Sequence, residues 1–474
     1  MAPPLRVLYL APEVAPWSKT GGLGEVAHAL PRALAAAGAD VRVLTPAYAA
    51  LAPVLSGARA IAELASPGGA LAAARLLEVP GEPTLWLLDC PEYYARPGGP
   101  YQGPEGVDWP DNHLRFGLLS RAGALLGGAA SPLDWRPDVV HGNDWQCGLA
   151  PAYLALAGGA RAASVMTLHN LAYQGLFAPD ALSALALPAE SFTPAGLEFH
   201  GSVSFLKAGV RYADAITTVS PTYAREIQGA ELGFGLDGLL RWRADRLVGI
   251  LNGIDTEAWD PARDPLIAQR YDVRHLYAKA ANKAALQRAF GLPESAGAPL
   301  AAVASRLVPQ KGIDLVLEVA DELVRAGAQL ALLGTGERAL ERALAALAAR
   351  HPRHVAVRIA FDEQLAHLLE AGADMFLMPS RFEPCGLNQF YSMRYGTPPV
   401  VRRTGGLADS VTEATGFLFD DPTPQALLGA LKRALDAWRD PARWRALQLA
   451  GMARDFGWQT AARAYLETYR GARA

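Results

Sequence analysis

Short apolar runs alternate with helical segments through most of this 474-residue chain. The expected strands of the first part are Arg6–Leu10, Val41–Thr45, Leu85–Cys90, Asp138–His141, Ser164–His169 and Ala215–Val219. Strands that alternate with helices of roughly 10–15 residues are typical of βαβ units, which build parallel sheets covered by helices. The alternation therefore predicts an α/β fold with doubly wound sheets.

The pattern resets near residues 245–260, where Leu247–Leu251 is a further expected strand, and a second series follows. Its strands are Leu300–Ala304, Gln329–Leu333, Val355–Ile359, Met375–Met378 and Pro399–Val401. We predict two Rossmann-like domains, residues 1–245 and 246–456, and a terminal segment, 457–474, whose helix packs back on the first domain. Ligands of such folds bind at the carboxyl ends of the strands, so we expect the two domains to face each other across a deep cleft.

Composition excludes several classes of protein. The formal net charge is −3, which gives no general basic character for binding nucleic acid. Three cysteines, Cys90, Cys147 and Cys385, lie far apart without a C-x-x-C pair, so neither a disulfide framework nor a zinc site is expected. No signal peptide and no apolar run of the ~18–20 residues of a membrane helix is visible, and we expect a reducing, cytoplasmic setting.

The segment from Ser18 to Val26 places glycines and a lysine between the first strand and an expected helix, Glu25–Ala37. A helix start offers backbone N–H groups and the positive end of the helix dipole, and glycine lets a ligand approach the backbone closely. Lys19 adds a compact positive charge. These features favour a phosphate-binding turn that includes Gly22 and Gly24. The alternative is an ordinary helix entry with a solvated lysine.

The same glycines fit the dinucleotide fingerprint G-x-G-x-x-G/A, from Gly22 to Ala27. That fingerprint expects its glycines directly after the first strand, but here a loop of several residues intervenes. It also expects an acidic residue at the end of the next strand, where this chain has Thr45 and Pro46. The context argues against an NAD-dependent dehydrogenase.

Polar clusters follow later strands of the first series. Asp144 lies in the segment 141–146, where it can orient sugar hydroxyls or begin a helix as its N-cap. His169 and Asn170 belong to a polar run, 167–175, that is costly to bury without partners. The loop 97–112, with Tyr101, has the length of a binding loop or a lid.

The second series carries a comparable set. Arg306 and Lys311 flank a strand-to-helix loop, an arrangement that suits phosphate. Glu383 stands at another strand-to-helix turn and can accept hydrogen bonds from ligand hydroxyls. Glycine-rich turns follow two more strands, at Gly334-Thr335-Gly336 and Thr404-Gly405-Gly406. Solvated loops and plain helix starts remain the alternatives, but together the clusters predict an enzyme that handles a sugar attached to a diphosphate.

Several motifs then resemble one family. They are Lys19-Thr20-Gly21-Gly22-Leu23-Gly24, the run from Thr167 to Gly175, Phe205-Leu206-Lys207-Ala208-Gly209, the run from Thr218 to Tyr223, and Glu383-Pro384-Cys385-Gly386-Leu387. In this order they resemble the bacterial branch of the glycogen/starch synthase family, retaining glycosyltransferases with the GT-B fold. The resemblance implies transfer of glucose from ADP-glucose to the non-reducing end of an α-1,4-glucan, without a metal or another cofactor.

The resemblance also implies roles for single residues. Lys19 and the Gly22 region would meet the donor phosphates, and Arg306 and Lys311 would stabilise the departing ADP. Glu383 would bond the glucose hydroxyls beside the backbone of Cys385, Gly386 and Leu387. His169 and Asp144 would place the glucose, and Tyr101 is a candidate acceptor contact. The remaining substrate-binding candidates are Gly24, Asn170, Gly334, Thr335, Phe361, Thr404, Gly405 and Gly406.

The chain departs from the family at a few positions. Phe361 stands where a tyrosine often stacks on adenine, Glu25 where many relatives have Asp, and Asn143 and Gln146 where His is frequent. The acceptor contacts are therefore open. A GT-B enzyme that uses UDP-glucose or a small acceptor, and a non-catalytic glucan-binding protein, are the alternatives. The sequence leaves the oligomeric state open.

Overall fold

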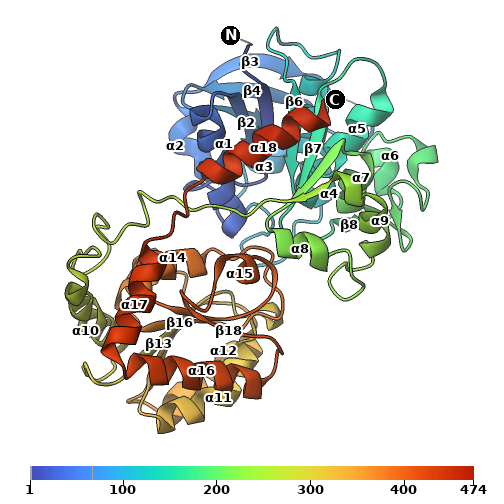
Figure 1. Cartoon of the computed structure of the whole chain (residues 1–474). Helices are drawn as coiled ribbons and strands as arrows, with labels where there is room; N and C mark the ends of the chain where they lie inside the picture. The colour runs from blue at the N-terminus through green and yellow to red at the C-terminus, as the bar shows by residue number, and fades with distance from the viewer. Residues whose placement is uncertain (1–2, 67, 474) are drawn as a thin grey trace. The chain divides into compact units, whose positions relative to one another are not determined.

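The computed structural model describes residues 3–66 and 68–473. The chain forms two compact units: one comprises the residues through Gly253 and again those from Trp458, and the other comprises Ile254–Gly457. Figure 1 shows both. Each unit is an α/β structure built on its own largely parallel sheet.

The sheet of the first unit has the strand order β12-β11-β7-β6-β1-β2-β5-β4-β3. Its strands are β1 Arg6–Leu10, β2 Asp40–Pro46, β3 Arg59–Leu64, β4 Ala74–Val79, β5 Thr84–Asp89, β6 Val139–Asn143, β7 Ala163–Leu168, β11 Ala215–Thr218 and β12 Leu247–Gly249. The helices are α1 Gly22–Ala36, α2 Ala52–Leu55, α3 Pro91–Tyr94, α4 Asn112–Gly127, α5 Leu149–Ala157, α6 Ala181–Ala184, α7 Phe205–Tyr212, α8 Pro221–Glu226, α9 Asp237–Trp242 and α18 Gln459–Ala472. A small antiparallel sheet, β8-β10-β9, consists of Leu176–Phe177, Ser202–Ser204 and Glu198–Phe199.

The central strand β1 shows why these residues form a buried parallel sheet. Val7, Leu8 and Leu10 are fully buried, and β1 pairs in parallel with both β2 and β6. A continuous apolar run suits a strand covered on both faces, and each buried aliphatic side chain contributes about 1.5–3 kcal/mol relative to exposure. This packing fixes the carboxyl ends of β1, β6 and β7 side by side.

The sheet differs from the sequence expectation at both edges. β12 pairs in parallel with β11, so this strand belongs to the first unit and the division falls at 253/254 rather than at 245/246. At the other edge β3 and β4 extend the sheet in antiparallel fashion, which the strand pattern did not predict.

The last helix, α18, packs on α1, β7 and β11 of the first unit. Figure 1 shows it in red beside α1. Tyr465 and Tyr469 are fully buried there, and the Tyr469 hydroxyl lies 2.7 Å from Nδ1 of His141 on β6. At its end, Arg473 pairs with Asp138 at 2.9 Å.

The sheet of the second unit has the order β15-β14-β13-β16-β17-β18 and is parallel throughout. Its strands are β13 Leu300–Ala304, β14 Gln329–Leu333, β15 Val355–Arg358, β16 Met375–Met378, β17 Pro399–Arg402 and β18 Phe417–Phe419. Its helices are α10 Lys279–Phe290, α11 Ile313–Arg325, α12 Arg338–Arg350, α13 Glu363–Gly372, α14 Asn388–Arg394, α15 Gly405–Ser410, α16 Pro424–Trp438 and α17 Pro441–Met452.

Candidate functional site

In the first unit, the predicted site residues follow the neighbouring strands β1, β6 and β7. Lys19, Gly22 and Gly24 lie after β1, Asp144 after β6, and His169 and Asn170 after β7. Because the carboxyl ends of adjacent parallel strands share one edge, these loops form a single cluster.

Glu13, which sequence reasoning missed, holds the lysine turn in place. Its buried carboxylate accepts hydrogen bonds from the backbone N–H groups of Thr20 at 2.8 Å and Gly24 at 3.0 Å, and from the Thr20 hydroxyl. Burial raises the pKa of Glu13, and the bonds from Thr20 oppose that rise. The only signal in the sequence is an acidic residue in the proline-containing loop directly after the first strand.

These bonds correct the expectation for the helix entry. Helix α1 begins at Gly22, three residues before the expected start, so Gly24 already lies in its first turn. The N–H group of Gly24 is occupied by Glu13 and is not available to an outside anion. Lys19 is partly exposed and its ammonium group pairs with the Glu25 carboxylate. The positive charge of this turn is therefore balanced within the chain.

Asp144 combines unusual backbone geometry with a perturbed carboxyl group. Its φ of 54° lies in the left-handed region, which costs energy for a residue other than glycine. Its Oδ1 accepts hydrogen bonds from the N–H groups of His169 at 2.7 Å and Asn170 at 3.4 Å. Burial raises the pKa of Asp144 to about 7. Asp144 thus holds the start of the His169 loop rather than capping a helix with its side chain.

Tyr101 lies in the same cluster, close to Glu13 and Thr20. Burial raises the pKa of Tyr101. Buried Arg115 holds the loop that carries Tyr101, because its Nη1 group donates to the carbonyl of Pro100 at 2.9 Å. The loop that begins at residue 97 therefore contributes a side chain to the cluster.

In the second unit, Glu383 follows β16 and the loop with Arg306 and Lys311 follows the neighbouring β13. Lys311 Nζ lies 2.5 Å from Glu383 Oε2, and the Ser380 hydroxyl donates to the same oxygen at 2.9 Å. The structure thus brings together a cation suited to phosphate and a carboxylate suited to sugar hydroxyls.

Backbone contacts tie these two loops to each other. The N–H of Arg381 donates to the carbonyl of Gln310 at 2.8 Å. The Asn388 amide donates to the carbonyl of Ala304, at the end of β13, at 2.7 Å. These bonds fix the positions from which Lys311 and Glu383 extend.

Two of the predicted glycines are required by the packing of the protein itself. A Cβ atom on Gly405, where φ is 44°, would lie 1.9 Å from the carbonyl oxygen of Glu383. A Cβ on Gly334 would lie 1.9 Å from the carbonyl oxygen of Ser305. At each of these glycines, the backbone of a neighbouring loop makes a close approach. The carbonyl group of Glu383 approaches Gly405, and that of Ser305, next to Arg306, approaches Gly334.

The remaining predicted residues also lie at this sheet edge. Cys385 is buried, and Leu387 directly precedes α14. Phe361 follows β15 and its side chain is 79% exposed. Around them the second unit places Thr335, Gly386, Thr404 and Gly406 after β14, β16 and β17.

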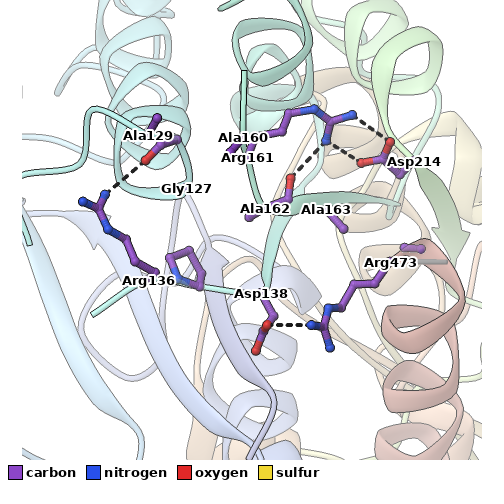
Figure 2. Close-up of a pocket in the computed structure, with 13 residues that line it drawn as sticks. Gly127, Ala129, Arg136, Asp138, Ala160, Arg161, Ala162, Ala163, Asp214 and Arg473 are labelled. Carbon is purple, nitrogen blue, oxygen red and sulfur yellow. Dashed lines mark hydrogen bonds and ion pairs between the residues drawn. The ribbon is translucent and has the colours of Figure 1, made fainter. Parts of the chain in front are cut away.

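A hollow of about 590 Å³ in the first unit lies elsewhere. Figure 2 shows it around Arg136, Arg161 and Arg473, near the amino ends of β6, β7 and β11. Arg161 binds Asp214 and Arg473 binds Asp138, so two of its arginines neutralise neighbouring carboxylates. None of the predicted site residues lines it.

Within residues 3–66 and 68–473, no group of three His, Cys, Asp or Glu side chains is arranged to hold a metal ion. In the same described part of the chain, none of the helices has both the length and the apolar character needed to cross a membrane.

Comparisons with known proteins agree along the whole chain. A family profile described as the starch synthase catalytic domain matches residues 6–242, and one described as glycosyl transferases group 1 matches residues 288–446. A glycogen synthase of Dechloromonas aromatica is 53% identical, over 99% of this chain and 98% of the relative. A glycogen synthase of Nitrosospira multiformis is 52% identical, over 98% and 97%.

Solved structures give the same result. The catalytic domain of starch synthase IV from Arabidopsis thaliana, solved with ADP and acarbose bound, superposes with a TM-score of 0.87 at 31% identity and 99% coverage of both chains. A sucrose-phosphate synthase from Thermosynechococcus elongatus, at 20% identity and a TM-score of 0.61 over 98% of each chain, shares the fold. The chain belongs to the glycogen and starch synthase family of hexosyltransferases, which have the GT-B fold of two Rossmann-like domains.

Proposed function

We propose that the chain transfers glucose from ADP-glucose to the non-reducing end of an α-1,4-glucan, with retention of the anomeric configuration. The bond between glucose C1 and the diphosphate oxygen breaks, a bond from C1 to the acceptor oxygen forms on the same face, and ADP leaves as the hydroxyl proton is released. Membership of the glycogen synthase family supports this reaction. The observation in the site that carries it is the Lys311–Glu383 pair.

Charge stabilisation of the leaving diphosphate is the main task of the site in this proposal. Arg306 and Lys311 bind the diphosphate in the second unit, and Lys19 contributes a further cation in the first. Glu383 exchanges its bond with Lys311 for bonds with glucose hydroxyls. Phe361 offers its exposed ring to the nucleotide base, since an aromatic face can stack on any base.

No metal or other cofactor takes part in this proposal, because the three cations supply the charge that a metal would otherwise bring. Transfer that continues undiminished in excess EDTA supports this view. Loss of transfer in EDTA, restored by a divalent cation, contradicts it.

The proposal is tested by initial rates of nucleotide release with glycogen as acceptor. ADP-glucose is expected to react faster than UDP-glucose, and ADP release is expected to require the glucan. Faster reaction with UDP-glucose, or release that depends on a small acceptor such as fructose or glycerate, favours the alternative GT-B activities. Glucan binding without any nucleotide release indicates a binding protein.

A further inference from the structure

Asn143, the last residue of β6, is fully buried and makes hydrogen bonds at both ends of its amide. Its Nδ2 donates to the carbonyl of Leu10 at 2.8 Å. Its Oδ1 accepts from the Tyr9 hydroxyl at 3.1 Å and lies 2.9 Å from Nε2 of His169. The side chain thus connects β1, at Tyr9 and Leu10, to the loop after β7.

The contact with Leu10 fixes which way the amide points. A backbone carbonyl can only accept a hydrogen bond, so the NH₂ group must face Leu10. The reversed amide would place two acceptor oxygens 2.8 Å apart. The oxygen of Asn143 therefore faces Tyr9 and His169. This orientation is assigned from the hydrogen-bond network around the amide.

This orientation decides the protonation of His169. Because Oδ1 is an acceptor only, Nε2 of His169 must carry a proton and donate it. Burial lowers the pKa of His169 to about 3, so the neutral ring holds just this one proton. Nδ1 is then an unprotonated acceptor, and no residue in the described part of the chain makes a hydrogen bond to it.

The main chain of His169 is fixed independently. Its N–H donates to Asp144 Oδ1 at 2.7 Å, so the backbone and the ring are both held by residues at the end of β6. His169 as a whole residue is only partly buried, so part of it is accessible to a ligand.

We propose that Asn143 is a positioning residue that holds His169 as the Nε2–H tautomer, so that Nδ1 accepts a hydrogen bond from one hydroxyl of the transferred sugar. The proposal rests on the proposed function for the identity of the sugar. It assigns a direction to the bond: the ligand group at Nδ1 is a donor. An analogue in which hydrogen or fluorine replaces this sugar hydroxyl cannot donate the hydrogen bond.

Nitrogen-15 NMR of the ring nitrogens in the full chain tests the tautomer without any turnover. His169 is assigned among the nine histidines by the signals that disappear in His169→Phe. At neutral pH we expect Nε2 in the protonated, pyrrole-like range and Nδ1 in the unprotonated, pyridine-like range. The reverse assignment, or a ring protonated at both nitrogens, overturns the proposal.

A pair of variants tests the role of Asn143. Tyr9→Phe removes the other donor to Oδ1 but leaves the bonds to Leu10 and His169, so the NMR signature should persist. Asn143→Leu has a similar volume and cannot accept, so the spectrum should shift to a mixture of tautomers. An unchanged tautomer in Asn143→Leu overturns the role of Asn143. If that variant does not fold, the wild-type spectrum still decides the tautomer.

ADP-glucose analogues that each lack one sugar hydroxyl test the acceptor. At one position, loss of the hydroxyl should lower kcat/KM of the wild type by about ten-fold, roughly 1.4 kcal/mol, because one hydrogen bond is lost. The same loss should cost His169→Phe nothing further. Independent, additive losses at every position overturn the proposal. If the wild type releases no ADP from ADP-glucose, the proposed function is wrong. The NMR experiment still decides the tautomer of His169, because it does not depend on turnover.

Discussion

Lys311 Nζ and Glu383 Oε2 lie 2.5 Å apart at the edge where β13 and β16 end. The Glu383 side chain is 6% exposed, so its charge depends on Lys311 and on the Ser380 hydroxyl for partners. A cation and a carboxylate that suit the two halves of a nucleotide sugar thus neutralise each other in the structure. In the proposed reaction, donor binding exchanges these bonds for bonds to phosphate and sugar.

Lys311→Met should reduce transfer by about 10²–10³-fold, because the variant loses a preorganised charge at the leaving group. It should also lower the free energy of unfolding by about 1–3 kcal/mol, because Glu383 is left without its cation. Initial rates and urea denaturation measure the two effects. Lys432→Met, at an exposed position on α16, is the matched control and should change neither. A Lys311→Met rate equal to wild type contradicts the assigned role.

Glu13→Gln should loosen the turn that carries Lys19. A glutamine has one acceptor oxygen in place of two, so the N–H of either Thr20 or Gly24 loses its partner. Limited proteolysis with trypsin, followed by mass spectrometry, should then show faster cleavage after Lys19. Glu63→Gln, at an exposed position on β3, is the control. Equal protection of Lys19 in both variants would show that Glu13 does not hold the turn.

Gly405→Ala should destabilise the second unit by at least about 2 kcal/mol. The backbone φ of 44° is unfavourable for alanine, and the added Cβ would lie 1.9 Å from the Glu383 carbonyl oxygen. Transfer should fall as well, since Glu383 must move. Gly297→Ala is the control: its Cβ would meet nothing within 4 Å, and the stability should change little. Both quantities can be read from urea midpoints and initial rates, and equal behaviour of the two variants contradicts the packing argument.

Asp144→Asn should change how stability depends on pH. The unfolded chain loses the Asp144 proton near the ordinary pKa of 3.8, whereas the folded chain keeps it to about 7. Unfolding therefore releases a proton between these values, and this carboxyl group makes the fold less stable as pH rises from about 4 to 7. Asparagine does not titrate, so the variant should not show this decrease in stability. From pH 4 to pH 8, its free energy of unfolding should therefore rise by about 2–4 kcal/mol relative to that of the wild type. Urea denaturation at both pH values measures the difference, and a constant offset contradicts the raised pKa.

The alternation of strands and helices predicted most of the scaffold. Strands such as β13, β14 and β16 fall where the apolar runs predicted them, because a buried parallel strand is a continuous apolar run between turn residues. The β3–β4 extension was missed because each of its strands contains an arginine and a glutamate that interrupt the apolar pattern. Pairing rather than composition makes these segments strands. β12 was placed in the wrong domain because the sequence of a strand does not show which strand it pairs with.

The site shows the same limit at single residues. Lys19, His169, Lys311 and Glu383 were predicted as site residues from their positions after strands, where parallel sheets bind ligands. Glu13 and Asn143 were not assigned a role, because their importance lies in contacts with residues distant in sequence. Asn143 was expected beyond the end of its strand, yet β6 runs through it and buries it completely. Which buried polar group meets which partner is decided by tertiary packing.

The most direct test of the proposed reaction is NMR of the product formed from ADP-glucose labelled with carbon-13 at C1 of the glucose. With a maltooligosaccharide acceptor, the proposal predicts a new α-1,4 linkage on the non-reducing terminal residue, formed in step with ADP. A β linkage, label that appears only as free glucose, or no ADP release would contradict it.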